Sequence, residues 1–170
     1  RAVLRMRIGI MSDTHDNLAR VDKAVKRLLE ENIDLVLHAG DYVAPFVIPH
    51  FKPFKGKFIG VFGNNDGDHE LLRRRFSENP SLEFRGSFAQ IVMDGLKIAL
   101  LHGTEEELLQ ALIDSEGFAV VVHGHFHKAE VYKKGKTLVV NPGELCGYLS
   151  GKSTAALLDT AKREAKIIQL

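Results

Sequence analysis

Short apolar runs alternate with segments of helical periodicity along the chain, and this alternation restricts the folds that it can adopt. Three runs in the first half, at 8–11, 33–37 and 57–62, have the length and apolar content of buried strands. Between the first two, apolar residues recur at the spacing of an amphipathic helix over 18–29, and Asn17 is suited to its N-cap. Strands that alternate with helices in this way predict an α/β domain.

The second half of the chain is richer in predicted strands. We expect two of them at 84–93 and 96–101, joined by an Asp94-Gly95 turn of the kind that favours hairpins. A helix is expected to open at Thr104, where Glu107 completes a capping box. Five further runs are predicted to be strands, the last four of them as a meander: 118–122, 129–133, 137–140, 154–158 and 165–170.

A single domain over residues 1–170 is the economical organisation, because the sequence has no low-complexity linker and no internal repeat. Residues 1–5 are interpreted as a possible N-terminal extension ahead of Met6, with no signal peptide. The one cysteine, Cys146, excludes an intrachain disulfide and fits a reducing compartment. Since no apolar run approaches the roughly 20 residues of a membrane-spanning helix, we predict a cytoplasmic protein.

Five predicted strands deliver polar residues directly after an apolar run. Because ligands of α/β sheets bind beyond the carboxyl ends of the strands, these residues are expected to converge. Glycine at several of the strand ends leaves room for backbone and ligand to come close. In chain order the five blocks are Asp13-x-His15, Gly40-Asp41, Gly63-Asn64, His102-Gly103 and Gly124-His125-x-His127.

The residue types in these blocks suit a metal centre. Carboxylate, amide and imidazole groups bind Mn²⁺, Fe²⁺, Ni²⁺, Co²⁺ or Zn²⁺, and the lack of a thiolate argues against a Cys-rich structural zinc site. Taken alone, Asp13 and His15 would be a turn or cap pair, and His102 a loop histidine. Their joint occurrence with the other blocks favours metal ligation, and the number of candidate ligands favours two ions that share a carboxylate.

The order and type of the five blocks, with Asn65-Asp66 extending the third, resemble the signature of calcineurin-like metallophosphoesterases. The small single-domain YfcE-like phosphodiesterases are the most similar branch, and the resemblance runs from the first strand to at least Pro142-Gly143. It implies a four-layer α/β/β/α sandwich, in which two mixed β-sheets pack face to face with flanking helices. It also implies two divalent metal ions, with Mn²⁺ as the first candidate.

Carried over residue by residue, the resemblance divides the ligands into two sets around one shared carboxylate. Each set would hold one ion through three side chains, and the shared carboxylate would bridge the pair. The first set is Asp13, His15 and His127, the second is Asn64, His102 and His125, and the bridge is Asp41.

Such a centre would hydrolyse a phosphate ester by attack of a metal-bridging hydroxide at phosphorus, without a protein nucleophile. Many relatives have a histidine where this chain has Asn65, which we expect to contact the leaving group or the phosphate. Because an amide cannot act as a general acid, a contribution of roughly 10²–10⁴-fold would be missing. We therefore predict a phosphodiesterase that favours acidic leaving groups, such as aryl phosphodiesters. His38 is expected either to support the ligands from behind or to be a packed strand histidine.

The charge balance narrows the class of substrate. The chain has 23 Lys and Arg against 22 Asp and Glu, so it lacks a broad basic field for nucleic acid or an anionic membrane. A small phosphate ester is expected, with nucleotides among the candidates, and a nuclease is disfavoured. A scaffold of the same fold, such as a retromer subunit, would carry decayed blocks, whereas all seven positions here can bind metal. The sequence leaves open whether the chain is a nucleotide phosphomonoesterase and whether it forms a homo-oligomer.

Overall fold

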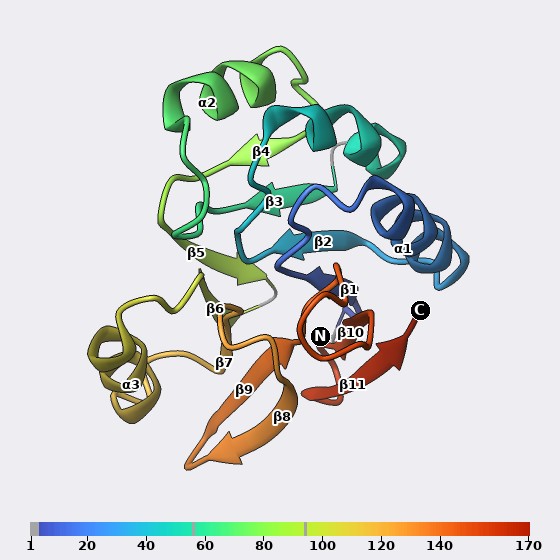
Figure 1. The fold of residues 1–170 in the computed structure, drawn as a ribbon. Coiled ribbons are helices and arrows are strands. Elements are labelled where there is room, and N and C mark those ends of the chain that lie inside the picture. The colour runs from blue at the N-terminus through green and yellow to red at the C-terminus, as the bar shows by residue number, and fades with distance from the viewer. Residues whose placement is uncertain (1–3, 56, 94) are drawn as a thin grey trace.

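Two β-sheets make up the centre of the computed structural model, which describes residues 4–55, 57–93 and 95–170 (Figure 1). The larger sheet contains β1 (Arg7–Met11), β2 (Leu35–His38), β3 (Phe58–Gly60), β4 (Glu83–Phe84), β10 (Thr154–Asp159) and β11 (Glu164–Gln169). The smaller sheet contains β5 (Phe88–Met93), β6 (Leu96–Leu101), β7 (Val120–Val122), β8 (Ala129–Lys134) and β9 (Thr137–Pro142). Within the described residues, their orders are β11-β10-β1-β2-β3-β4 and β5-β6-β7-β9-β8.

Both sheets are mixed. In the larger one, β1 to β4 pair in parallel and β10 joins β1 in antiparallel fashion. In the smaller one, β6, β7 and β9 are parallel, while β5 and β8 are antiparallel edge strands. The parallel strands of each sheet place their carboxyl ends at one edge, which is where polar residues follow each apolar run.

The central core lies between the two sheets. Ile8 and Ile10 of β1 belong to the same buried apolar cluster as Ile98 and Leu100 of β6. Because successive side chains of a strand point to opposite faces, the alternate residues pack outward, as Ala99 does beneath the helix of the smaller sheet. The apolar runs of the sequence are thus strands that are buried on both faces.

Helices cover the outer face of each sheet (Figure 1). The larger sheet is covered by α1 (Leu18–Glu30), the 3₁₀ segment η1 (Pro45–Phe54) and α2 (His69–Ser77), and the smaller by α3 (Glu106–Asp114). This arrangement is the predicted four-layer α/β/β/α sandwich. The first helix is amphipathic as predicted, with Val21, Val25 and Leu28 buried, although Leu29 at its end is exposed. The Asn17 side chain caps it by accepting from the Arg20 N–H at 3.3 Å.

Several predicted elements differ from the structure. The run 84–93 is not one strand: Phe84 ends β4 in the larger sheet, and β5 begins at Phe88 in the smaller sheet, after a turn in which Gly86 has a φ of +78°. The capping box is wrong, because α3 begins after Glu105 and has no side-chain cap. Asp94 of the predicted hairpin turn lies outside the described residues, as do residues 1–3 of the predicted extension.

The predicted meander is divided between the two sheets. The hairpin β8–β9 extends the smaller sheet, whereas β10 returns to pair with β1, for example Ile10 opposite Ala156. Two covering segments, α2 and η1, were not anticipated; prolines at 49 and 53 in η1 interrupt the helical pattern that the sequence would otherwise show. None of the helices in the described residues has the length and apolar character that crossing a membrane demands.

Candidate metal centre

Loops from both sheets meet beyond the carboxyl ends of the parallel strands. Within each sheet, backbone hydrogen bonds join neighbouring loops: the Asp13 N–H donates to the Gly40 carbonyl at 3.0 Å, and the Gly124 N–H to the His102 carbonyl at 3.0 Å. Between the sheets, the His125 N–H donates to Asp13 Oδ2 at 3.1 Å. The convergence expected from the sequence is therefore present. In chain order the strand ends deliver Asp13 and His15 after β1, Asp41 after β2, Asn64 after β3, His102 after β6, and His125 and His127 after β7.

The backbone is left-handed at five of the predicted ligands. A φ in this region costs a non-glycine residue about 1–3 kcal/mol, and such strain is found chiefly at functional sites, where surrounding contacts enforce it. One such contact is the 3.1 Å hydrogen bond from the His15 N–H to the Asp41 carbonyl. The values are +54° at Asp13, +38° at His15, +62° at Asp41, +69° at His125 and +56° at His127.

Three imidazole Nε2 atoms face two buried carboxylates. Asp41 Oδ2 lies 3.3 Å from Nε2 of His15 and 3.3 Å from Nε2 of His102. Asp13 Oδ1 lies 3.3 Å from Nε2 of His127 and 3.6 Å from Nε2 of His15. Two ligands that each sit about 2.1 Å from one ion are roughly 3.0–3.4 Å apart. The spacing of these atoms therefore suits metal coordination.

Hydrogen bonds behind the rings fix which nitrogen faces the site. His102 Nδ1 lies 2.7 Å from the Ala39 carbonyl, which can only accept, so Nδ1 carries a proton. His127 Nδ1 lies 2.7 Å from Oε2 of Glu144, again an acceptor when ionised. In the neutral ring, Nε2 then presents a lone pair to the carboxylate opposite. That arrangement is stable only with a cation or a proton between the two atoms.

Buried polar atoms without a hydrogen-bond partner lie in the same cluster. Among the buried side-chain atoms that the structure describes, four lack a hydrogen-bond partner, and three of these are Asp13 Oδ1, His15 Nε2 and His102 Nε2. Buried polar atoms nearly always have a hydrogen-bond partner, so three without one in a single cluster need a common explanation. Binding of divalent ions by these atoms would explain it, and the residue types present suit such ions.

The electrostatics of the cluster favour added positive charge. The nearby carboxylate of Asp13, and then that of Asp41, raises the pKa of His15 to about 10. Burial alone would raise the pKa of Asp41, but the close imidazoles of His102 and His15 hold it well below its usual range. Burial lowers the pKa of His102, yet the contact with Asp41 and the charge of Asp13 raise it overall. Protons and divalent ions therefore compete for the same atoms.

The residues of the second predicted set lie next to one another. His125 Nδ1 is 3.0 Å from Asn64 Oδ1, and the rings of His125 and His102 are 5.2 Å apart. His102 connects this group to Asp41 Oδ2. The structure thus brings the seven predicted ligand residues together, with the Asp41 carboxylate between the two sets.

Asn65 contacts the same carboxylate. Its backbone N–H donates to Asp41 Oδ1 at 2.9 Å, and its side-chain Nδ2 donates to Oδ2 at 2.8 Å. In this structure the amide orients Asp41, a contact that sequence analysis did not anticipate. Its expected role toward the leaving group or the phosphate stays a proposal.

His38 is fully buried behind the site. Its Nδ1 accepts from the Gly40 N–H at 3.0 Å, so Nε2 carries the proton and donates to Thr14 Oγ1 at 3.2 Å. Thr14 in turn donates to the Asp41 carbonyl at 3.4 Å, and the His38 ring stacks on Tyr42 with centroids 4.0 Å apart. Desolvation lowers the pKa of His38, which keeps the ring neutral. The ring is thus packed in the core and linked through Thr14 to the Asp41 loop, and its expected role behind the metal ligands stays a proposal.

Glu144 is a partner of the site that the sequence pattern did not indicate. Its side chain is 1% exposed and contacts His127 Nδ1, and it also accepts from the backbone N–H groups of Leu149 and Ser150. Burial would raise its pKa, but the hydrogen bonds from Ser150 and His127 lower it to about 2. An acidic residue that directly follows Asn141-Pro142-Gly143 was the available signal.

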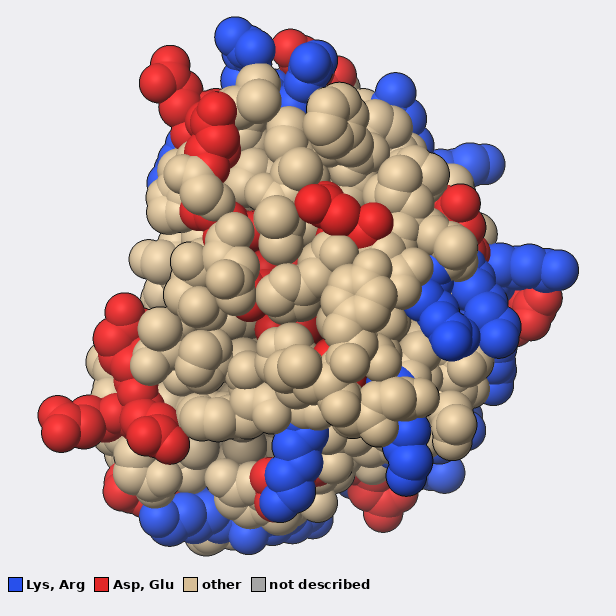
Figure 2. Space-filling view, in the orientation of Figure 1, with Lys and Arg blue, Asp and Glu red and all other residues tan. Residues whose placement is uncertain are grey.

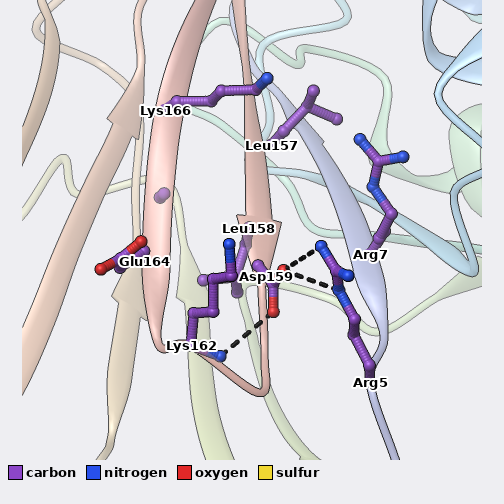
Figure 3. A pocket seen from close by; sticks show the side chains of 9 residues that line it. Arg5, Arg7, Leu157, Leu158, Asp159, Lys162, Glu164 and Lys166 are labelled. Carbon is purple, nitrogen blue, oxygen red and sulfur yellow. Dashed lines mark hydrogen bonds and ion pairs between the residues drawn. The ribbon is translucent and has the colours of Figure 1, made fainter.

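A second hollow lies at the opposite end of β1 from Asp13 (Figure 3). It is lined by several basic side chains, among them Arg5, Arg7 and Lys162. Arg5 pairs with Asp159 at 2.8 Å, and Arg7 pairs with Glu31 at 2.6 Å. The Asp159 carboxylate of this hollow is already occupied by Arg5, and the basic side chains around it disfavour a cation, so this hollow does not compete with the cluster at the strand ends.

The chain is similar to known phosphoesterases over nearly its whole length. Residues 6–163 match the model of the calcineurin-like phosphoesterase superfamily domain. The chain is 39% identical over 165 residues to phosphodiesterase MJ0936 of Methanocaldococcus jannaschii, covering 97% of this chain and 99% of that protein. A solved archaeal phosphodiesterase has a TM-score of 0.91 at 39% identity, over 97% of this chain and 100% of that one. The E. coli phosphoesterase Yfce shares the fold, with a TM-score of 0.70 at 16% identity over 97% and 98% of the chains.

Proposed function

The chain belongs to the calcineurin-like phosphoesterase superfamily, and on that premise we propose that it is a dinuclear metal-dependent phosphodiesterase acting on small phosphate esters. The observation that carries the proposal is the position of Asp41 Oδ2, 3.3 Å from Nε2 of both His15 and His102. A carboxylate oxygen shared by two histidines from different sheets is suited to bridge two ions. The similarity to an archaeal phosphodiesterase over nearly the whole chain supports the choice of diesters.

We assign the two ions to the sets inferred from the sequence. Asp13, His15 and His127 would hold one ion, and Asn64, His102 and His125 the other. Oxygen and imidazole nitrogen donors suit Mn²⁺, which is our first choice, and Fe²⁺, Co²⁺, Ni²⁺ and Zn²⁺ bind the same donor types. When bound, the pair supplies Lewis-acid activation of water and neutralises charge on the phosphoryl oxygens.

The side chains of this protein position the reacting groups and set the protonation of the site. The Ala39 carbonyl and Glu144 hold His102 and His127 in the tautomer whose Nε2 is free for a ligand. Asn65 holds the Asp41 carboxylate through two hydrogen bonds. Because its amide has no proton to give at neutral pH, the departing alcohol must leave largely as an anion. Acidic leaving groups are therefore favoured, and aryl diesters should react faster than alkyl monoesters.

Other features of the chain bear on its domain organisation, cellular location and oligomeric state. The family match over 6–163 supports a single domain across the described chain. We place the enzyme in the cytoplasm, which the free thiol of buried Cys146 supports. A nucleotide is retained among the small substrates, and a homo-oligomer is compatible with the exposed apolar side chains of Phe46 and Leu149.

A substrate panel with metal analysis on the same sample tests the function. The panel contains bis(4-nitrophenyl) phosphate, 4-nitrophenyl phosphate, an alkyl monoester and cyclic nucleotides, each with Mn²⁺, Ni²⁺ or Co²⁺ added. We expect the aryl diester to be hydrolysed fastest, with about two ions per chain and loss of activity in EDTA. Preference for a monoester would indicate a phosphomonoesterase. Two bound ions without turnover of any compound would favour a scaffold of the same fold.

A further inference from the structure

An apolar cleft opens beside the metal centre and shares two of its residues. Asn64 and His102 line a cavity of about 660 Å³. Phe62 beyond β3, Phe88 at the start of β5 and Leu108 on α3 form other parts of its wall. A molecule held at Asn64 and His102 would therefore extend into the cleft.

The walls of the cleft are aromatic and partly exposed. The His69 ring stacks on Phe62 with centroids 3.7 Å apart and an interplanar angle of 10°, and both residues line the cleft. Phe88 and Leu108 keep 40% and 52% of their surface exposed. Large apolar side chains gain stability when such surface is removed from water, and a flat aromatic partner would also stack. The wall thus favours an aromatic group over a polar one.

The charge at the rim selects against a second anionic group. Glu105 lines the cleft, and Glu106 and Glu107 follow it in the first turn of α3, with Glu106 lining a different hollow. Figure 2 shows acidic side chains gathered at the lower left, where Figure 1 places α3. Acidic groups here would repel a neighbouring phosphate of a polynucleotide. An uncharged ester arm fits both the apolar wall and this rim.

We propose that the cleft binds an uncharged aromatic ring on one ester arm of the substrate, while the phosphate lies at the metal centre. Phe88 and Leu108 are then residues that determine specificity by contacting the ring. The inference rests on the proposed phosphodiesterase function and adds the chemical class of one arm. Neither residue belongs to the predicted ligand sets, so both can be changed without altering the metal ligands.

Binding of two non-hydrolysable phosphonates tests the proposal. Phenylphosphonate and methylphosphonate present the same anionic group, but only the first carries an aromatic ring. Calorimetric titration of the Mn²⁺-loaded full chain should show phenylphosphonate binding about tenfold more tightly. Titration at several temperatures should also show a more negative heat-capacity change for it, because apolar surface is buried. Thymidine 5′-phosphate is a third probe, and Phe88-dependent binding of it would assign the ring to a nucleobase.

Single substitutions test whether the wall of the cleft causes the preference for phenylphosphonate. Phe88→Ala and Leu108→Ala should each reduce the preference for phenylphosphonate to about two- to threefold and leave methylphosphonate binding unchanged. Val92→Ala is the matched control, since Val92 is 60% exposed on the same face of β5 but does not line the cleft. Equal binding of the two phosphonates, or a preference that both cleft variants retain, overturns the inference. If the aryl diester is hydrolysed in that case, the proposed function stands; no hydrolysis and no binding overturns both.

Discussion

Oε2 of Glu144 lies 2.7 Å from Nδ1 of His127, and this contact turns the other ring nitrogen, Nε2, toward Asp13 Oδ1 at 3.3 Å. The carboxylate is itself held in place by the backbone N–H groups of Leu149 and Ser150. A metal-binding histidine commonly has such a carboxylate behind it, which fixes the tautomer and makes the ring a better ligand. Glu144 therefore belongs to the site although it is not among the expected ligands.

Glu144→Gln should weaken metal binding without unfolding the protein. The amide oxygen can still accept from the backbone, but the negative charge behind His127 is lost. Second-sphere changes of this kind reduce metal affinity by about 10–100-fold, and we expect a loss in that range for one of two ions. Calorimetric titration of the metal-free chain with Mn²⁺ measures it. Glu164→Gln on β11 is the control, and equal affinities of the two variants would count against this role.

Gly63→Ala should distort the site because there is no room for a side chain. A Cβ at this position would lie 2.0 Å from Asp41 Oδ1 and 2.4 Å from the Asp41 nitrogen. Forcing an extra methyl group into packed surroundings costs about 1–3 kcal/mol, and here the atoms that must move belong to the proposed bridge. We expect a lower melting temperature and weaker binding of both ions.

Gly67→Ala in the same loop is the matched control for that variant. A Cβ at Gly67 would meet nothing within 4 Å, so neither stability nor metal binding should change appreciably. Differential scanning fluorimetry with and without Mn²⁺ compares the two variants. A Gly63→Ala protein that binds metal as tightly as Gly67→Ala would show that the loop adjusts without moving Asp41.

Asn65→His tests the preference for acidic leaving groups. An imidazole beside the phosphate could protonate a departing alkoxide, which an amide cannot do. The rate for an alkyl ester should therefore rise, by up to roughly 10²-fold, while the rate for a nitrophenyl diester changes little. Asn65→Ala separates the two roles of the residue, because it removes the hydrogen bond to Asp41 without adding an acid. An unchanged alkyl rate in Asn65→His would remove the support for this preference.

The sequence was sufficient to predict that the candidate ligands lie close together, because each block follows an apolar run. Strand ends in a parallel sheet meet at one edge whatever the length of the connections, so Asp13 and Asp41 could be expected to converge. The pairing of β10 with β1 was not predictable, since it depends on a contact between residues such as Ile10 and Ala156 that are far apart in the chain. Local pattern carries no information on which sheet a short strand will join.

Supporting residues were harder to predict than ligands. Glu144 is separated from the apolar run before it by Asn141-Pro142-Gly143, so it does not directly follow that run as the candidate ligands follow theirs. Its role follows only from the fold that brings it to His127. Asp66, which extends the third block, accepts from the N–H groups of Asp41, Val43 and Gly63. Only the bond from Gly63 is local and typical of a turn; those from Asp41 and Val43 depend on the fold.

Cys146 should make the protein less stable in alkaline solution. Burial, with a further contribution from the hydrogen bond to Glu144, raises the pKa of the thiol from 9.0 to about 12. Because the unfolded chain releases this proton first, stability is fully present below pH 9 and is lost as the pH rises toward 12. Urea unfolding between pH 8 and 11 should show a steeper loss for the native chain than for Cys146→Ala. Parallel curves for the two proteins would exclude a contribution from the thiol.

Asp41→Asn should weaken both metal sites, whereas a change in any other ligand should weaken chiefly one. Asp41 Oδ2 contacts His15 from the first set and His102 from the second, so loss of its charge affects both. His15→Ala and His125→Ala remove a ligand from one set each, and each variant should keep about one ion per chain. Mass-spectrometric metal analysis after dialysis against limiting Mn²⁺ measures the stoichiometry, with Asp22→Asn as a surface control. Two tightly bound ions in Asp41→Asn would show that the carboxylate does not bridge, and one tightly bound ion would assign Asp41 to a single set.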